Sequence, residues 1–309
     1  MVKSSAELVQ MAWNLGVVVP SFNVPYLPMV EPIVRAIRDQ DAIAFVAVAR
    51  LEWVKFESRS LSAVMEEYQR WQDPRHVRLH LDHVPVMDED HQQVDVLAII
   101  KEAIALGYQS VMVDGSRLAL ADNIRATRSV VALAHAAGIA CEAELGAVLG
   151  HEDGPLPPYE ELFRSGKGFT RVEEARRFVR ESGCDWLSVA IGNIHGAVSQ
   201  AARDNKKIEA HLDLEHLNRL RDATGIPLVL HGGSGVRRED VQAGIQRGLA
   251  KVNVGTETRQ AYEAALKTSG DVDAAQQAVY AKTAWLIGEY FGRKSMRPAH
   301  LRQTGAMQN

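Results

Sequence analysis

The chain has little cysteine and no long hydrophobic run. Its 309 residues include two cysteines, Cys141 and Cys184, which fit neither a disulfide framework nor the spacing of a zinc-binding motif. No segment approaches the ~20 consecutive apolar residues of a membrane helix, and the N-terminal stretch lacks the apolar core of a signal peptide. We therefore expect a cytoplasmic protein without a membrane segment.

The charge balance is also unremarkable. The formal net charge is −4 and the basic residues are spread along the chain, which argues against a nucleic-acid-binding surface. With so few cysteines, any metal site must be built from the eleven histidines and the carboxylates. The length allows one large α/β barrel or two ordinary domains.

Short apolar runs alternate with amphipathic segments along the whole chain. The runs predict eight strands, at 17–24, 42–48, 77–83, 110–115, 140–144, 185–191, 228–231 and 251–254. The segments predict helices from Ser4, where a capping box stands, and at 29–39, 60–71, 94–106, 119–137, from a second capping box at 170–173, and at 209–223, 237–247, 257–267 and 274–291. Eight such units without a linker predict an α/β fold, a single (β/α)8 TIM barrel over 1–309 with a C-terminal helical extension from about 270. An open doubly wound sheet is the alternative, disfavoured because no strand leads into a GxGxxG fingerprint.

One connection breaks this rhythm. Residues 146–169, after the fifth strand, are rich in glycine, proline and charge and show no clear period. A loop of this length inside a barrel is typical of a lid, and Glu152 lies on it.

Polar side chains mark the strand ends, where barrels carry their active sites. They are Asn23, Asp82, His83, Asp114, Glu144, His195, His231 and Asn253. Three neutral imidazoles with an open position make a catalytic zinc site, and His83, His195 and His231 are the best placed. His80 lies three positions before His83, so on an ideal strand these two side chains face opposite ways.

The turn after the seventh strand reads His231-Gly232-Gly233-Ser234-Gly235. Its free backbone N–H groups suit an anion such as phosphate, although a tight strand–helix turn with a buried histidine fits the same residues. Asn253 and Thr256, at the end of the eighth strand, complete the predicted anion site. A metal that polarises a carbonyl beside a phosphate site indicates a small phosphorylated ketone as substrate.

With these residues assembled, the chain resembles the class II, zinc-dependent fructose-bisphosphate and tagatose-bisphosphate aldolases, more closely the tagatose type. The motifs that carry the resemblance are Leu79-His80-Leu81-Asp82-His83, Val111-Met112-Val113-Asp114-Gly115-Ser116, Glu142-Ala143-Glu144-Leu145-Gly146, Gly192-Asn193-Ile194-His195-Gly196, His231-Gly232-Gly233-Ser234-Gly235 and Lys251-Val252-Asn253-Val254-Gly255-Thr256.

The resemblance implies reversible cleavage of a ketose phosphate to dihydroxyacetone phosphate and an aldehyde. By position, it assigns zinc to His83, His195 and His231, and a second divalent metal to Asp114 and Glu144. It assigns proton transfer at the cleaved bond to Asp82, proton exchange at the donor carbon to Glu152, and a hydrogen bond to the enediolate to Asn253. The donor phosphate would lie on Gly196, Gly232, Ser234 and Thr256, with a monovalent cation nearby. A homodimer or homotetramer is also implied.

Two departures from the family pattern concern the substrate. Asn193 stands where the family usually has threonine, and the stretch after the second strand, Val46-Ala47-Val48-Ala49-Arg50, lacks the serine that helps to hold the phosphate of the aldehyde half. We therefore expect an aldehyde other than glyceraldehyde 3-phosphate, with Arg50 meeting a different acidic group. The alternatives are an aldolase with another donor or acceptor, and a non-catalytic barrel that assists a partner aldolase.

Overall fold

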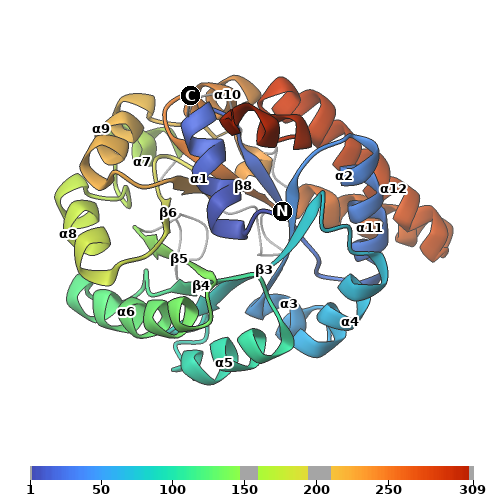
Figure 1. Ribbon diagram of the computed structural model, residues 1–309, viewed down its shortest axis with the longest axis horizontal. Helices are drawn as coiled ribbons and strands as arrows, with labels where there is room; N and C mark the ends of the chain where they lie inside the picture. Colours follow the sequence, from blue (N-terminus) through green and yellow to red (C-terminus); the bar gives the residue numbers. More distant parts are fainter. Residues whose placement is uncertain (1, 147–158, 194–209, 306–309) are drawn as a thin grey trace.

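The computed structural model, which describes residues 2–146, 159–193 and 210–305, is a closed barrel of eight parallel strands in sequential order. The strands are β1 (Val19–Asn23), β2 (Ala44–Ala49), β3 (Val77–Pro85), β4 (Ser110–Asp114), β5 (Ala140–Leu145), β6 (Trp186–Val189), β7 (Leu228–Leu230) and β8 (Leu249–Val254). Because β8 pairs with β1 and closes the ring, the (β/α)8 prediction is confirmed and the open sheet is excluded (Figure 1).

The described helices surround the strands, except that α1 (Ser5–Leu15) packs against the inner apolar cluster. The others are α2 (Val30–Asp39), α3 (Arg50–Lys55), α4 (Leu61–Trp71), α5 (Val96–Leu106), α6 (Leu120–Ala136), α7 (Tyr159–Ser165), α8 (Val172–Ser182), α9 (Leu214–Thr224), α10 (Arg238–Ile245), α11 (Thr256–Ser269) and α12 (Val272–Trp285). A π-helical stretch, Leu286–Phe291, continues α12, and a 3-10 helix, Pro298–Gly305, lies near the C-terminus. None of the described helices is long and apolar enough to cross a membrane.

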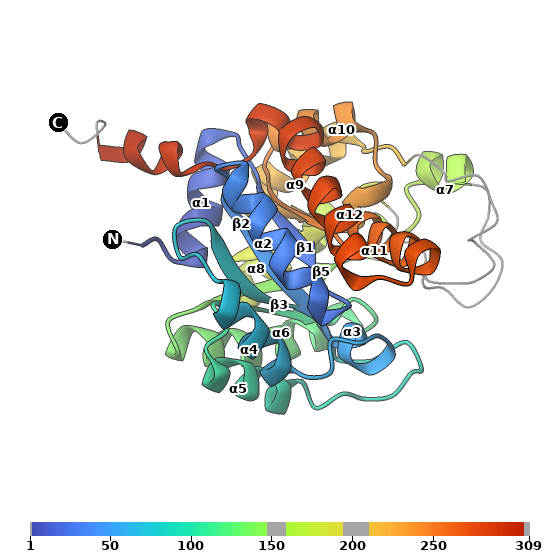
Figure 2. The same ribbon diagram turned by 90° about the vertical axis from the view of Figure 1, so that its right-hand side faces the viewer.

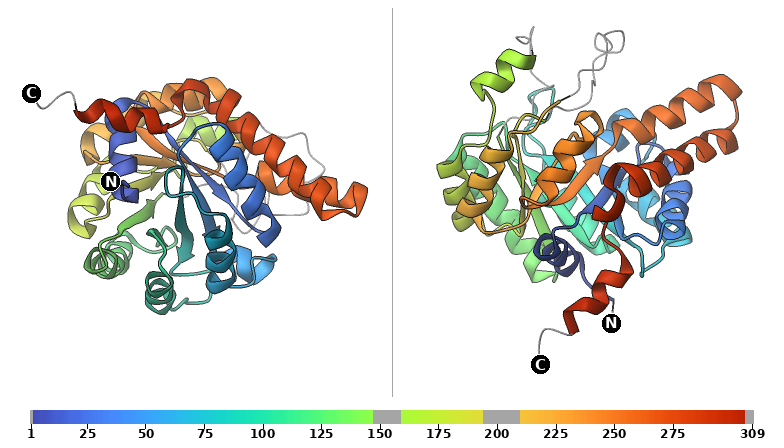
Figure 3. Two further views of the ribbon diagram at one scale, coloured as in Figure 1. Left: turned by 45° about the vertical axis from the view of Figure 1, so that its right-hand side comes forward. Right: turned by 90° about the horizontal axis from the view of Figure 1, so that it is seen from above.

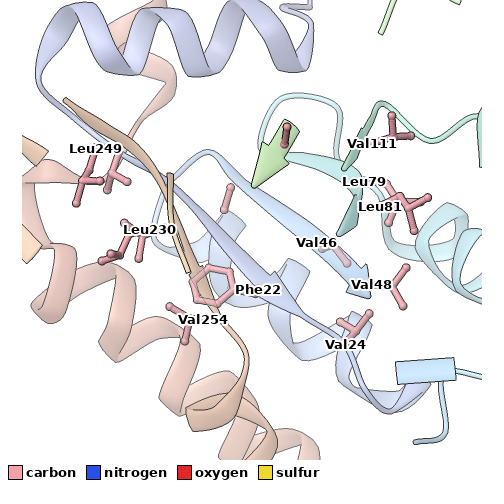
Figure 4. Packing of buried hydrophobic residues seen from close by; sticks show 14 of the residues in the cluster. Phe22, Val24, Val46, Val48, Leu79, Leu81, Val111, Leu230, Leu249 and Val254 are labelled. Atoms are coloured by element: carbon pink, nitrogen blue, oxygen red, sulfur yellow. The ribbon is translucent and has the colours of Figure 1, made fainter. Parts of the chain in front are cut away.

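Alternating side chains give the strands two faces, which contribute to two separate apolar cores. Val46 and Val48 of β2 and Leu79 and Leu81 of β3 belong to the large apolar cluster that also takes in the surrounding helices (Figure 4). Residues on the other face of the strands form a second, smaller cluster with α1, whose Leu8 packs there. The capping box predicted at the start of α1 is confirmed. Ser4 Oγ accepts from the Glu7 amide at 3.2 Å, and the Glu7 carboxylate accepts from the Ser4 amide at 2.8 Å.

Both faces of the barrel strands are thus buried, as parallel sheets require. Helix α7 and the C-terminal 3-10 helix lie at opposite ends of the molecule (Figure 2). The α11–α12 pair packs together and projects beyond the ring of helices (Figure 3).

Three local predictions were wrong. Thr170 does not cap a helix: its hydroxyl donates to the Leu145 carbonyl and accepts from the Ala190 amide at 2.8 Å, so it ties β5 to β6, and α8 starts after Arg171 without a side-chain cap. Helix α9 begins at Leu214, not at 209, because Asp213 accepts from the His216 amide and caps it there. The stretch predicted as a featureless loop contains α7, and the short helix α3 was missed.

Candidate active site

A bulge in β3 brings His83 into the barrel mouth. Strict alternation places His80 and Asp82 on the inner face and His83 on the outer one. The pairing of β3 with β4 shifts register between Leu81 and Val84, and His83 has a φ of +24°. This irregularity turns the imidazole inward, where its Nε2 lies 2.5 Å from His231 Nδ1.

His80 faces inward as well, by ordinary strand alternation, one level below the mouth. Its Nδ1 lies 2.9 Å from the Ser110 hydroxyl and its Nε2 is 3.5 Å from Glu142. Burial and the nearby Lys251 ammonium lower the pKa of His80 to about 3, so the ring is neutral. The prediction that His80 and His83 face opposite ways was wrong, because the bulge breaks the alternation on which it rested.

Imidazole nitrogens and carboxylate oxygens converge beside these two rings. Asp82, His83 and His231 form one group that could hold a metal ion, and His83, Asp114 and Glu144 form another, with the ligand atoms of each group within 4.8 Å of one another. His83 Nδ1 lies 3.3 Å from Asp114 Oδ2, and Glu144 Oε2 lies 3.5 Å from His231 Nδ1. Mixed nitrogen and oxygen donors suit a divalent ion such as zinc, so the residues present fit the expected metal.

The two carboxylates at the rim differ in proton affinity. Burial and the neighbouring Asp114 raise the pKa of Glu144 to about 8. The pKa of Asp114 is shifted in the opposite direction. Burial would raise it, but contact with His83 holds it well below its usual range. Without a metal, Glu144 therefore carries a proton near neutral pH, and a cation bound there would displace it.

His231 is oriented by a carboxylate beneath it. Glu142 Oε1 lies 2.7 Å from His231 Nε2. Burial would raise the pKa of Glu142, but Lys251 and His231 outweigh it and lower that pKa to about 2. An ionised carboxylate only accepts hydrogen bonds, so Nε2 carries the ring proton and the lone pair of Nδ1 faces His83. This is the usual way in which a metal-binding histidine is oriented.

Asp82 is held between two amides. Asn23 donates to Oδ2 and Asn253 donates to Oδ1, each at 2.9 Å. Burial opposes ionisation of Asp82, but the nearby His83 and His231 hold its pKa well below the usual range. Asp82 is therefore a carboxylate fixed in place at the mouth of the barrel.

The glycine-rich turn after β7 lies next to the start of α11. Gly232 has a φ of +68°, and a Cβ on Gly233 would lie 2.6 Å from Val252 Cγ1, so both positions favour glycine. Thr256 opens α11 directly after β8, the strand that pairs with β7. Tyr290 braces the turn from outside by donating to the Gly233 and Val236 carbonyls at 3.0 and 2.8 Å.

Glu152, His195 and Gly196 lie outside the described residues, as does the side chain of Ser234. The structure brings Asp82, His83, Asp114, Glu144, His231 and Asn253 together at one end of the barrel, with Gly232 and Thr256 on neighbouring strand ends.

Glu52, Glu142 and Lys251 are charged residues of the site region that were not predicted. Glu142 lies two positions before Glu144, and Lys251 two before Asn253, so the period of a strand places each on the inner face with its neighbour. That signal was present in the sequence. Glu52, by contrast, reaches the site through the short helix α3.

The side of the site near β2 is formed by Ala49, Arg50 and Glu52. Ala49 pairs with Asp82 across β2 and β3, and the buried Glu52 carboxyl accepts from the Ala49 amide at 2.7 Å. Arg50 Nη1 lies 3.4 Å from Asp88 Oδ2, so Arg50 pairs with an acidic residue of the chain itself.

Comparison with known proteins identifies the family. The family model described as "Fructose-bisphosphate aldolase class-II" matches residues 3–303. The chain belongs to the class II fructose-bisphosphate aldolase family. It is therefore an aldolase, a lyase of a family that acts on phosphorylated sugars and is generally metal-dependent.

Individual relatives agree with this assignment. The chain is 36% identical over 285 residues to a fructose-bisphosphate aldolase of Streptococcus pneumoniae, covering 90% of this chain and 87% of that protein. It is 34% identical over 284 residues to one of Streptococcus pyogenes, covering 90% and 86%. Among solved structures, the YdjI aldolase of Escherichia coli K12 is similar with a TM-score of 0.73 and 27% identity, covering 95% of this chain and 98% of that one.

Proposed function

We propose that the chain is a zinc-dependent aldolase that reversibly cleaves a ketose phosphate to dihydroxyacetone phosphate and an aldehyde. The observation that carries the proposal is the pair of imidazole nitrogens on His83 and His231, which face each other 2.5 Å apart beside Asp82. Nitrogen donors favour zinc over magnesium or calcium. His195 is proposed as the third histidine ligand, and Asp114 and Glu144 as ligands of a second divalent metal.

The bound metal would supply a Lewis acid that polarises the ketone oxygen. In the proposed cleavage, the Asp82 carboxylate accepts the proton of the hydroxyl group next to the scissile bond. The carbon–carbon bond then breaks and the aldehyde is released. The electron pair of the broken bond remains on the donor half as an enediolate. The Asn253 amide, whose NH2 group faces the mouth, would donate to this enediolate, and Glu152 would return a proton to the donor carbon.

The donor phosphate is proposed to lie on the turn after β7 and the start of α11. Gly196, Gly232, Ser234 and Thr256 would hold it, with a monovalent cation nearby. The adjacency of β7 and β8 supports this placement, because it brings the turn after β7 close to the N-terminus of α11.

The aldehyde half is proposed to differ from glyceraldehyde 3-phosphate. The relatives' names point to fructose bisphosphate, but the β2 side of this site has Ala49 and Arg50 where the family usually offers a hydroxyl group. Arg50 already pairs with Asp88, and the Glu52 carboxyl occupies the Ala49 amide. Each feature makes this side less suited to a second phosphate.

Product formation tests the proposal directly. Purified protein would be incubated with dihydroxyacetone phosphate and a panel of phosphorylated and unphosphorylated aldehydes, alongside metal analysis. We expect bound zinc, an aldol product that is lost with a chelator and restored by zinc, and no product from Asp82→Asn. Protein without metal and without product would favour a helper barrel. Fructose 1,6-bisphosphate cleavage at a rate ordinary for metal aldolases would refute only the statement on the aldehyde.

Assembly and location are part of the same proposal. We propose a homodimer or homotetramer, which light scattering of the purified protein would test. A cytoplasmic location is supported by Cys141 and Cys184, which are both free and buried.

A further inference from the structure

A lysine is completely buried inside the barrel, below the candidate metal site. Lys251 on β8 has no exposed surface, and its Nζ lies 2.8 Å from Glu142 Oε2 and 2.6 Å from Asn253 Oδ1. Burying an ammonium group is unfavourable unless it is paired and hydrogen-bonded, and Lys251 meets both conditions. It lies one level too deep for the mouth residues and has no part in the proposed chemistry.

On one side, Lys251 fixes the direction of an amide. A lysine ammonium only donates hydrogen bonds, so the Asn253 side-chain oxygen must face it. The amide NH2 group then faces the other way, toward Asp82 Oδ1 at 2.9 Å. The donor group of Asn253 is thereby presented at the mouth of the barrel.

On the other side, Lys251 fixes the position of a carboxylate. Glu142 Oε2 accepts from Lys251 and, at 2.6 Å, from Trp186 Nε1. Its other oxygen faces His231 Nε2 at 2.7 Å. Because Lys251 Nζ and Trp186 Nε1 both donate to one oxygen of Glu142, the other oxygen is held toward His231 Nε2, which leaves the Nδ1 lone pair directed at His83.

One buried chain of contacts therefore joins the two halves of the site. It runs through His231, Glu142, Lys251, Asn253 and Asp82, and no link is longer than 2.9 Å. We infer that Lys251 is a positioning residue that sets both the metal-facing lone pair of His231 and the donor face of Asn253, although it touches neither metal nor substrate. This inference rests on the proposed function.

The test replaces the lysine by a neutral chain of similar length. We expect Lys251→Met to bind zinc 10- to 100-fold more weakly, as is typical when the orienting partners of a ligand are lost, measured by competition with a chromophoric chelator. In the metal-free protein labelled with 15N-histidine, we expect the His231 signals to move toward the other tautomer. We also expect kcat to fall more than KM rises. Lys282→Met, which breaks a partly buried pair with Glu257, is the matched control and should change none of these.

Unchanged zinc affinity and an unchanged His231 tautomer in folded Lys251→Met would overturn the inference. If that variant does not fold, Lys251→Met combined with Glu142→Gln removes both buried charges together. The double variant should again bind zinc at least 10-fold more weakly, and wild-type affinity would refute the inference. Failure of the proposed function looks different, because wild-type protein would then bind no zinc and form no aldol product.

Discussion

His83 holds a backbone conformation that glycine tolerates and other residues resist. Its φ of +24° lies in the irregular stretch of β3, and a positive φ costs a residue with a Cβ about 1–2 kcal/mol. We predict that His83→Gly is more stable than His83→Ala. Both variants lose the same imidazole contacts with Asp114 and His231, so their difference isolates the backbone.

The magnitude follows from two opposing effects. At an ordinary strand position glycine is less stable than alanine by about 0.5–1 kcal/mol, because it loses more conformational freedom on folding. Relief of the strain at His83 exceeds this, which leaves about 0.5–1 kcal/mol in favour of glycine. For 309 residues that corresponds to only about 1 °C in melting temperature.

Urea unfolding in the presence of a chelator is therefore the better assay. Ala143, which is buried in the regular strand β5, provides the control. Ala143→Gly should lower the free energy of unfolding by at least about 0.5 kcal/mol. At position 83, replacing alanine by glycine should instead raise it. If His83→Ala equals or exceeds His83→Gly in stability, the strain argument fails. Neither His83 variant should bind zinc with wild-type affinity.

Two further predictions concern Glu52 and a pair of glycines. Burial and the nearby Asp82 raise the pKa of Glu52 from 4.5 to about 8, so its contribution to stability is fully present below pH 4.5 and is lost as the pH rises toward 8. The unfolding free energy of Glu52→Gln, measured in urea, should therefore rise relative to that of the wild type by up to about 1.4 kcal/mol per pH unit between pH 5 and 8. A difference that does not change with pH would contradict this. Gly192 has a φ of +111°, and an added Cβ would lie 2.4 Å from the His211 carbonyl oxygen, whereas Gly225, with a φ of +65°, has no atom within 4 Å of such a Cβ. Gly225→Ala should cost about 1 kcal/mol and Gly192→Ala about 2–5 kcal/mol in unfolding free energy, and equal losses would show that the contact is relieved elsewhere.

The order of strands and helices was predictable because it depends on local patterns. Buried strands such as β2 read as short apolar runs, and amphipathic helices such as α2 repeat apolar residues at helical spacing. Termination signals were also local: Gly107 ends α5 in the left-handed conformation that glycine favours. Where the pattern was weak, as at α3 and α7, the elements were missed.

Helix starts were less predictable than helix bodies. Ser4 and Thr170 both stand three residues before a glutamate, yet only Ser4 caps a helix. The Thr170 hydroxyl is taken by the Leu145 carbonyl and the Ala190 amide, which come from other strands. A hydroxyl side chain can make several different hydrogen bonds, and folding decides which of the possible partners lies within reach. Those partners are distant in the sequence, so the residues around Thr170 do not reveal them.

The sequence by itself determined the barrel and the polar residues at its strand ends, because periodicity and strand ends are local properties of the chain. Only the tertiary structure decided how those residues point. The register shift between β3 and β4 turns His83 inward, and the meeting of β5 with β8 inside the barrel joins Glu142 to Lys251. Both depend on distant strands packing together, and a bulge or a buried ion pair exists only once those strands are in place.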